Sequence, residues 1–277
     1  MLSFLSDAGR TVGAVALAGA VSLSAGCAPN ITTQQEVQLG DEYAAELARQ
    51  LPLVRDQSVV NYINALGNEI SQRADPRGIR YNFYVVNAPE VNAFAVPGGH
   101  IYVNRGLIER TANMSELAGV LAHEIGHVVH RHGIEQVQRA QNANVGLAVI
   151  YGVLLGRNPS GIEQVGTQVI GTAVFAGYSR DAERQADETA IQYLIASGIH
   201  PSGLVTMFET LMAERERNPG SVEQWFSTHP TTQERIDNTR AAIAQIPAST
   251  LQRLTTTSQS YAQFRTRVSQ LPAAPNR

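Results

Sequence analysis

The sequence of 277 residues predicts an α+β fold that is mainly α-helical, with a small antiparallel sheet packed on a histidine-bearing helix. Three observations predict it: two amphipathic helical patterns come first, strand patterns are confined to residues 80–104, and helical periodicity returns after residue 113. The composition, 43% hydrophobic and 16% charged, is that of a globular protein. The net charge of -3 has no basic block behind it, which argues against a nucleic-acid partner.

The first 26 residues have the pattern of a lipoprotein signal peptide, with Arg10 ahead of an apolar run over residues 11–23. That run is too short to remain as a membrane span. It ends in LSAGC, which resembles a bacterial lipobox, so we expect Cys27 to be lipidated and to anchor the chain to the membrane. By resemblance to sorted lipoproteins, Ala28 then favours the periplasmic face of the outer membrane. A buried helix with a core cysteine is the alternative.

The segment before the central helix supplies two helices and the sheet. Residues 34–51 and 59–74 have apolar positions at helical spacing, and the alternating, aromatic-rich residues 80–86 predict a strand. Residues 92–104 predict two short strands that are joined at Pro97-Gly98-Gly99, since proline and glycine interrupt the pattern there.

The rest of the chain is expected to be helical. Asn113 begins a helix that stops at Gly133, and the apolar run 145–155 after it is either a buried helix or a hairpin that faces the envelope or a substrate. Long helical patterns follow over 162–198 and 201–217. We expect one domain over residues 27–240, followed by a C-terminal segment, 241–277, that is either helical or a loose tail.

The central helix carries the segment LAHEIGHVVHRH, residues 121–132. On a helix, His123 and His127 project from one face and can hold one ion, and Glu124 lies close enough to a metal-bound water to take its proton. This is the arrangement of zinc peptidases. Solvated helix histidines are the alternative. His130 and His132 are expected to be supporting or exposed residues.

A catalytic zinc needs a third protein ligand, and the best acidic candidate lies in SRDAERQADETA, residues 179–190. Glu183 and Asp187 are four apart and share a helix face. Glu183 can ligate while Asp187 accepts the outer N–H of a ligand histidine. The alternative is a surface charge cluster with Arg180 and Arg184.

Four segments together resemble one family: NAFAVPGGHIYVNRGLI, HEIGH, SRDAERQAD and STHPTTQERI, in that chain order. They resemble the gluzincin zinc metallopeptidases that include the CAAX prenyl proteases, the HtpX-like proteases and periplasmic lipoprotein members resembling the β-barrel-assembly-enhancing protease. The resemblance implies a zincin-like fold and one Zn²⁺ per chain, with His123, His127 and Glu183 as metal ligands and Glu124 as general base. It also implies that Asp187 supports a ligand histidine without binding the metal itself.

The same resemblance implies roles for two later residues and for one strand. His229 is expected beside the metal, as an oxyanion donor or as a fourth ligand in a resting state, and Arg235 is expected to be catalytic. The strand His100-Ile101-Tyr102-Val103 is expected to be an edge strand that pairs with an extended substrate.

The expected function is that of a zinc metalloendopeptidase of the bacterial cell envelope, acting on extended or misfolded proteins in quality control. A zinc-containing chaperone or assembly factor for outer-membrane proteins, with little or gated proteolysis, is the alternative. A purely structural lipoprotein without metal is the third. The prenyl-protein branch of the family is disfavoured because the sequence lacks multiple membrane spans.

Overall fold

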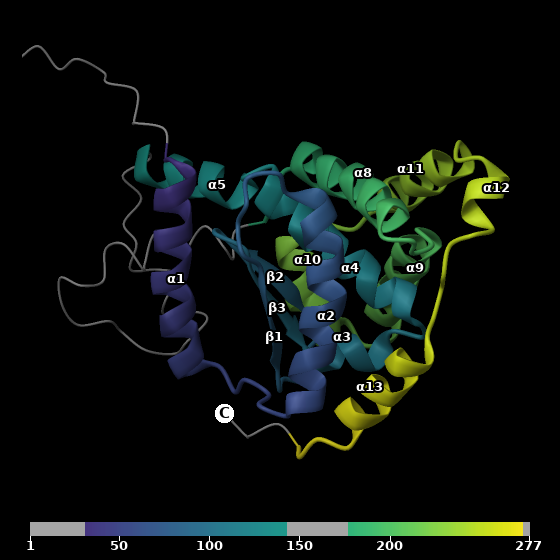
Figure 1. The fold of residues 1–277 in the computed structure, drawn as a ribbon, viewed down its shortest axis with the longest axis horizontal. Coiled ribbons are helices and arrows are strands. Elements are labelled where there is room, and N and C mark those ends of the chain that lie inside the picture. Colours follow the sequence, from purple (N-terminus) through teal and green to yellow (C-terminus); the bar gives the residue numbers. More distant parts are fainter. Residues whose placement is uncertain (1–30, 143–176, 274–277) are drawn as a thin grey trace, which may run out of the picture.

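The computed structural model describes residues 31–142 and 177–273. The expected signal peptide, Cys27 and the apolar run 145–155 lie outside the described residues. Within the described ranges, helices surround a small sheet, as the sequence predicted (Figure 1).

The sheet contains β1 (Asn82–Val86), β2 (Ala93–Val96) and β3 (His100–Asn104), in the order β1-β3-β2. β2 pairs with β3 in antiparallel register, but β1 and β3 are parallel, so the expectation of a wholly antiparallel sheet is wrong. The loop between β1 and β2 carries the chain to the opposite edge, and a second reversal at Pro97-Gly98-Gly99 places β3 in the centre. Two reversals leave β3 running in the same direction as β1.

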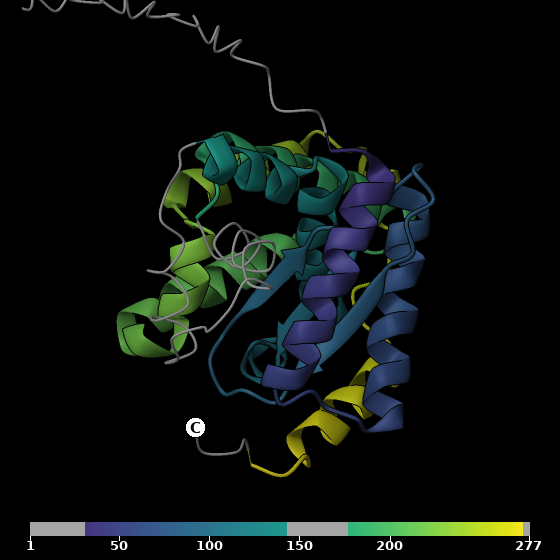
Figure 2. The same ribbon diagram turned by 90° about the vertical axis from the view of Figure 1, so that its left-hand side faces the viewer.

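Helices cover both faces of this sheet (Figures 1 and 2). α1 (Thr33–Gln50) covers one face, where Tyr102 packs in a cluster with Tyr43 and Leu47. α2 (Gln57–Ala74) and α4 (Met114–Val129) cover the other, where Ile101 and Val103 join the main core. Successive side chains of a strand point to opposite faces, so a single strand binds both helical layers to the sheet.

The helix with the histidines begins where the sequence predicts. The Asn113 side chain accepts a hydrogen bond from the Glu116 N–H at 3.2 Å and so caps α4. The helix ends earlier than expected, at Val129, and the chain turns through His130 and Arg131 into a separate helix, α5 (His132–Asn142).

α4 is the centre of the helical layer and contacts α8 (Arg180–Ala196) and α9 (Ser202–Arg217) closely. The contact with α8 is closest to the backbone at Gly126, where an added Cβ would lie 3.1 Å from the Cα of Ala186, tighter than most Cβ contacts. This close approach places Glu183, one turn before Ala186, beside the histidines of α4.

The remaining described helices are short or peripheral: α3 (Arg105–Arg110), α10 (Pro219–Thr228), α11 (Gln233–Ala244), α12 (Ala248–Leu251) and α13 (Gln259–Ser269). α13 is not a loose tail, since its residues Tyr261, Phe264 and Val268 are buried in the main core. Arg105 also binds the backbone carbonyls of Leu271 and Pro272. The described part of the expected C-terminal segment, up to residue 273, therefore shares the core of the preceding domain.

No helix in residues 31–142 or 177–273 is long and apolar enough to cross a membrane.

Candidate metal centre and active site

Four buried side chains from three parts of the chain converge on one point. His123 and His127 come from α4, Glu183 from α8 and His229 from the residue after α10, and one nitrogen or oxygen of each lies within 4.8 Å of the others. All four side chains are at most 1% exposed. Three of them are the expected ligands, and the fourth is the expected neighbour.

Helix geometry accounts for the histidine pair. His123 and His127 lie one turn apart on the face of α4 that meets α8, and their Nε2 atoms are 3.0 Å apart. The Glu183 carboxylate faces both, with Oε1 3.4 Å from His127 Nε2 and Oε2 3.5 Å from His123 Nε2. Two imidazoles and a carboxylate are a donor set of catalytic zinc sites, so these residues fit the metal that the sequence implied.

Glu124 lies beside this group and is fully buried. Its Oε1 is 3.4 Å from His229 Nε2. Neither carboxylate oxygen has a partner with good hydrogen-bond geometry among the described residues. Burial raises the pKa of Glu124, which the nearby histidines and the backbone N–H of Ala95 partly offset. A buried carboxylate with a raised pKa is suited to accept a proton.

His123 is held from behind by a carboxylate. Its Nδ1 lies 2.8 Å from Asp187 Oδ1, which is the contact expected for Asp187. Burial lowers the pKa of His123, but the hydrogen bonds with Asp187 and Glu183 outweigh it and raise this pKa to about 9. For His127 burial prevails, and its pKa lies well below the usual range.

Arg235, on α11, bridges the two carboxylates of α8. Its Nε and Nη2 each lie 2.8 Å from an oxygen of Asp187, and its Nη1 forms an ion pair with Glu183. Burial opposes ionisation of Glu183, but His229 and Arg235 hold its pKa well below the usual range. The guanidinium therefore faces the carboxylates of Glu183 and Asp187, and a catalytic role in direct contact with substrate stays a prediction.

His229 is fixed at the end of α10. Its backbone N–H donates to the Trp225 carbonyl at 2.8 Å, and its ring packs on the buried Trp225 ring at a centroid distance of 4.7 Å. The Nδ1 faces Glu183 at 3.2 Å and His123 Nε2 at 3.4 Å, while Nε2 faces Glu124. One nitrogen thus belongs to the group that could hold a metal, and the other faces the expected base.

Two contacts of His127 were not predicted from the sequence. Tyr178 stacks on its ring at 3.9 Å between centroids, and no local pattern other than its position before SRDAERQAD marks that tyrosine. His132 is buried, and its Nδ1 lies 2.9 Å from His127 Nδ1, so it is a supporting residue. His130 is exposed and contacts Thr189 at 2.7 Å.

The expected substrate strand is not at an edge. β3 is paired on both sides, so His100, Ile101, Tyr102 and Val103 cannot bind a peptide through free backbone groups, and that expectation is wrong. The His100 ring contacts Tyr84 Oη of the neighbouring β1 at 3.2 Å and Asp41 of α1 at 2.9 Å. Among the described strands, the one nearest Glu124 that has a partner strand on one side only is β2, whose residues are buried.

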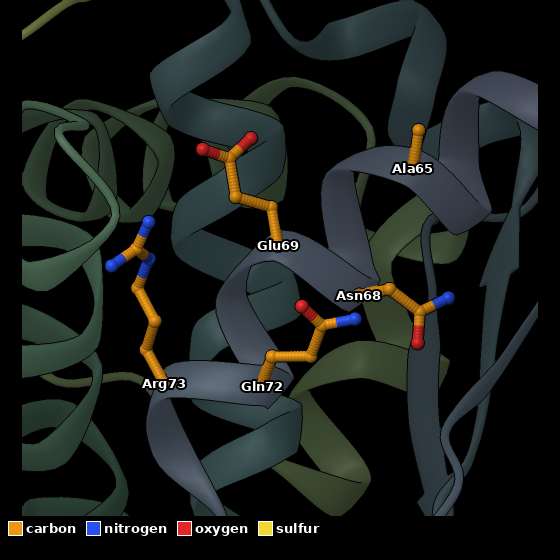
Figure 3. Close-up of a pocket in the computed structure, with 5 residues that line it drawn as sticks. All are labelled: Ala65, Asn68, Glu69, Gln72 and Arg73. Carbon is orange, nitrogen blue, oxygen red and sulfur yellow. The ribbon is translucent and has the colours of Figure 1, made fainter.

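A hollow on α2 is separate from this centre. It is lined by Ala65, Asn68, Glu69, Gln72 and Arg73 (Figure 3). These side chains spread over the surface of one helix and do not converge, and none belongs to the buried group of histidines and carboxylates. In the described part of the chain, the buried group of histidines and carboxylates lies between α4, α8 and the end of α10.

Comparison with known proteins agrees with this geometry. The model of peptidase family M48 matches residues 55–243, a range that contains all the residues of the metal centre. The chain belongs to peptidase family M48.

Several relatives carry protease names. The chain is 31% identical over 231 residues to a β-barrel assembly-enhancing protease of Yersinia pestis, covering 82% of this chain and 47% of the relative. For the protein of that name in Escherichia coli the identity is 30% over 250 residues, covering 86% and 51%. Metalloprotease YcaL of Escherichia coli is 31% identical over 222 residues, covering 79% and 77%. The chain thus spans about half the length of the assembly-enhancing relatives.

Proposed function

We propose that this chain is a zinc-dependent metalloendopeptidase of the bacterial cell envelope that cleaves extended or misfolded proteins. The observation that carries the proposal is the convergence of His123, His127 and Glu183 on one point, with the buried carboxylate of Glu124 beside it. Family membership and the metalloprotease names of relatives support the reaction class.

We propose that His123, His127 and Glu183 hold one zinc ion. The Asp187 carboxylate fixes the His123 ring, and Arg235 holds both Asp187 and Glu183 in place. Bound zinc would acidify a water molecule and polarise the scissile carbonyl.

The protein's own groups then move the protons. Glu124 takes the proton of the attacking water and later delivers it to the leaving amine. Its burial suits both steps, because a raised pKa brings its proton affinity closer to that of its reaction partners. His229 either donates to the negative charge that develops on the carbonyl oxygen or fills the open metal position at rest.

We further propose that substrates bind as an added strand along β2. Asn104 N–H donates to the Asn92 carbonyl at 2.9 Å, and alternate residues of an antiparallel pair share such bonds. Ala93 and Ala95 therefore direct their N–H and C=O groups away from β3, and the Ala95 N–H faces Glu124. An edge of this kind holds a peptide by its backbone, which favours extended and unfolded chains over a fixed sequence.

For location, we propose lipidation at Cys27 and attachment to the periplasmic face of the outer membrane. The signal pattern over residues 1–26 and the envelope-related names of the relatives support this. Mass spectrometry of the N-terminal peptide from envelope fractions tests it, and an unmodified Cys27 in the mature chain would contradict it.

A chaperone or assembly factor for outer-membrane proteins is the second candidate. It is favoured by the position of His229, whose Nδ1 faces the metal group and could keep hydrolysis low. The name of those relatives, β-barrel assembly-enhancing protease, fits either activity.

The experiment compares wild type with Glu124→Gln on a urea-unfolded outer-membrane protein and on the same protein folded. A peptidase of extended chains should produce defined internal fragments from the unfolded form only, and only with wild type. Fragments formed equally by Glu124→Gln would refute the assignment. In cells, full envelope function of Glu124→Gln would favour the chaperone.

A further inference from the structure

The two histidines of α4 are supported in chemically different ways. His123 Nδ1 lies against the carboxylate of Asp187, which Arg235 holds. His127 Nδ1 lies 2.9 Å from His132 Nδ1, and His132 Nε2 lies 3.0 Å from the Oε1 of Gln185 on α8. His123 is therefore supported by a carboxylate, whereas His127 is supported by an imidazole that is itself supported by an amide.

The hydrogen bonds between His127, His132 and Gln185 allow one arrangement of protons when His127 directs Nε2 to the metal. Its Nδ1 must then carry the proton, because a metal-bound imidazole has one remaining N–H. His132 Nδ1 must accept that hydrogen bond, so the proton of His132 lies on Nε2. The Gln185 oxygen beside Nε2 is an acceptor, which completes the chain without a conflict.

The backbone is shaped to bring His132 back toward α4. Arg131, between the two helices, has a φ of 60°, in the left-handed region that residues with a Cβ rarely adopt. Its side chain is held by the buried carboxylate of Glu36 at 2.8 Å. Such a conformation is unfavourable for a residue with a Cβ and persists where the surroundings enforce it. The turn lets the first residue of α5 point at His127.

We propose that His132 is a positioning residue that fixes the tautomer and the ring orientation of ligand His127, and that Gln185 fixes His132. This rests on the proposed function only in that it assumes His123, His127 and Glu183 hold zinc. A neutral acceptor withdraws less of the Nδ1 proton than a carboxylate does, so His127 is the weaker electron donor of the pair. The asymmetry leaves the bound metal more electron-poor than two carboxylate-supported histidines would.

The test uses the full-length chain loaded with zinc, and it measures the rate of zinc loss to a chelator and the turnover of an unfolded protein substrate. His132→Ala should speed zinc loss by about 10-fold to 100-fold. His132→Asn should stay within about threefold of wild type, because its Oδ1 takes the place of Nδ1 as acceptor. Gln185→Ala should give a smaller change in the same direction, about threefold, since water can replace the amide.

His130→Ala is the matched control. It removes an exposed imidazole two residues away, whose ring centroid is 5.4 Å from that of His132 and which binds Thr189 instead of a ligand. We expect no change in zinc loss for this variant. Nitrogen-15 NMR of the histidines should show His132 in the zinc-loaded wild type as the Nε2–H tautomer, a signature that packing alone would not fix.

Zinc loss from His132→Ala at the wild-type rate, or a His132 that carries its proton on Nδ1, would overturn the proposal. If His132→Ala does not fold, Gln185→Ala decides, because Gln185 is exposed and its loss leaves the core intact. A Gln185→Ala protein that loses zinc at the wild-type rate would then refute the proposed hydrogen-bond path from Gln185 through His132 to His127. Altered zinc loss without any proteolysis in wild type would refute the proposed function and leave this inference standing.

Discussion

Replacement of Arg235 by methionine tests the charge balance of the site. Arg235 is 8% exposed and is the cation that forms ion pairs with both Glu183 and Asp187, while its guanidinium lies 4.7 Å from the Phe208 ring centroid. Methionine keeps much of the apolar contact but removes the charge. Breaking a buried ion pair by deleting one partner costs about 3 to 5 kcal/mol, because the other partner is left buried and uncompensated.

The cost should depend on metal. In the metal-free protein, both carboxylates lose their cation, and the free energy of unfolding should fall by the full amount of about 3 to 5 kcal/mol. In the zinc-loaded protein the metal's charge replaces part of the cation at Glu183, so the loss should be smaller. Urea unfolding at pH 7, with and without zinc, measures both values.

Arg240→Met on the same helix is the control. Its side chain is 53% exposed and pairs with Asp237 and Glu209 at the surface, so its loss should change the free energy of unfolding by less than about 1 kcal/mol. A metal-free Arg235→Met protein as stable as Arg240→Met, or an equal loss with and without zinc, would refute the electrostatic reasoning.

Two further predictions concern pH and packing. The raised pKa of His123, about 9 against 6.5 unfolded, gives metal-free protein stability that is complete below pH 6.5 and is lost as pH rises through 9. His127, with a depressed pKa, acts oppositely: stability falls as pH drops below 6.5. The melting temperature of the metal-free protein should therefore peak near pH 6.5. Zinc should reduce the fall of the melting temperature above pH 6.5, because it displaces the His123 proton. A metal-free melting temperature that stays constant from pH 6.5 to 9 would count against this reasoning. Gly126→Ala should destabilise the fold by about 1 to 3 kcal/mol, because the new Cβ forces Ala186 and its helix outward. Glu183 moves with that helix, so turnover should fall more than stability alone explains; unchanged turnover would mean that the close approach does not position Glu183.

Local patterns predicted the parts of the site that lie on single helices. The i, i+4 spacing of His123 and His127 follows from helix geometry, and the spacing of Glu183 and Asp187 follows in the same way. His229 lies 106 residues beyond His123 in the chain, and only the resemblance of STHPTTQERI to a family placed it at the metal. No periodicity within α10 encodes that long-range contact.

The errors have a common physical cause. The alternating residues of β3 correctly indicated a strand, but strand order depends on where the loops carry the chain, so its central position was not predicted. His132 follows the end of α4 at Val129, whereas the helix was expected to continue up to Gly133, and the left-handed Arg131 turns His132 inward. Both features depend on tertiary packing, which a single sequence does not display directly.

The most direct test of the central claim measures zinc content and turnover on the same preparation of Glu124→Gln. We predict one zinc per chain, as in wild type, with proteolysis reduced by at least about 100-fold, because a proton acceptor is lost while the metal ligands stay. Wild-type turnover in the zinc-loaded variant would contradict the account, and so would a wild-type chain that binds no metal.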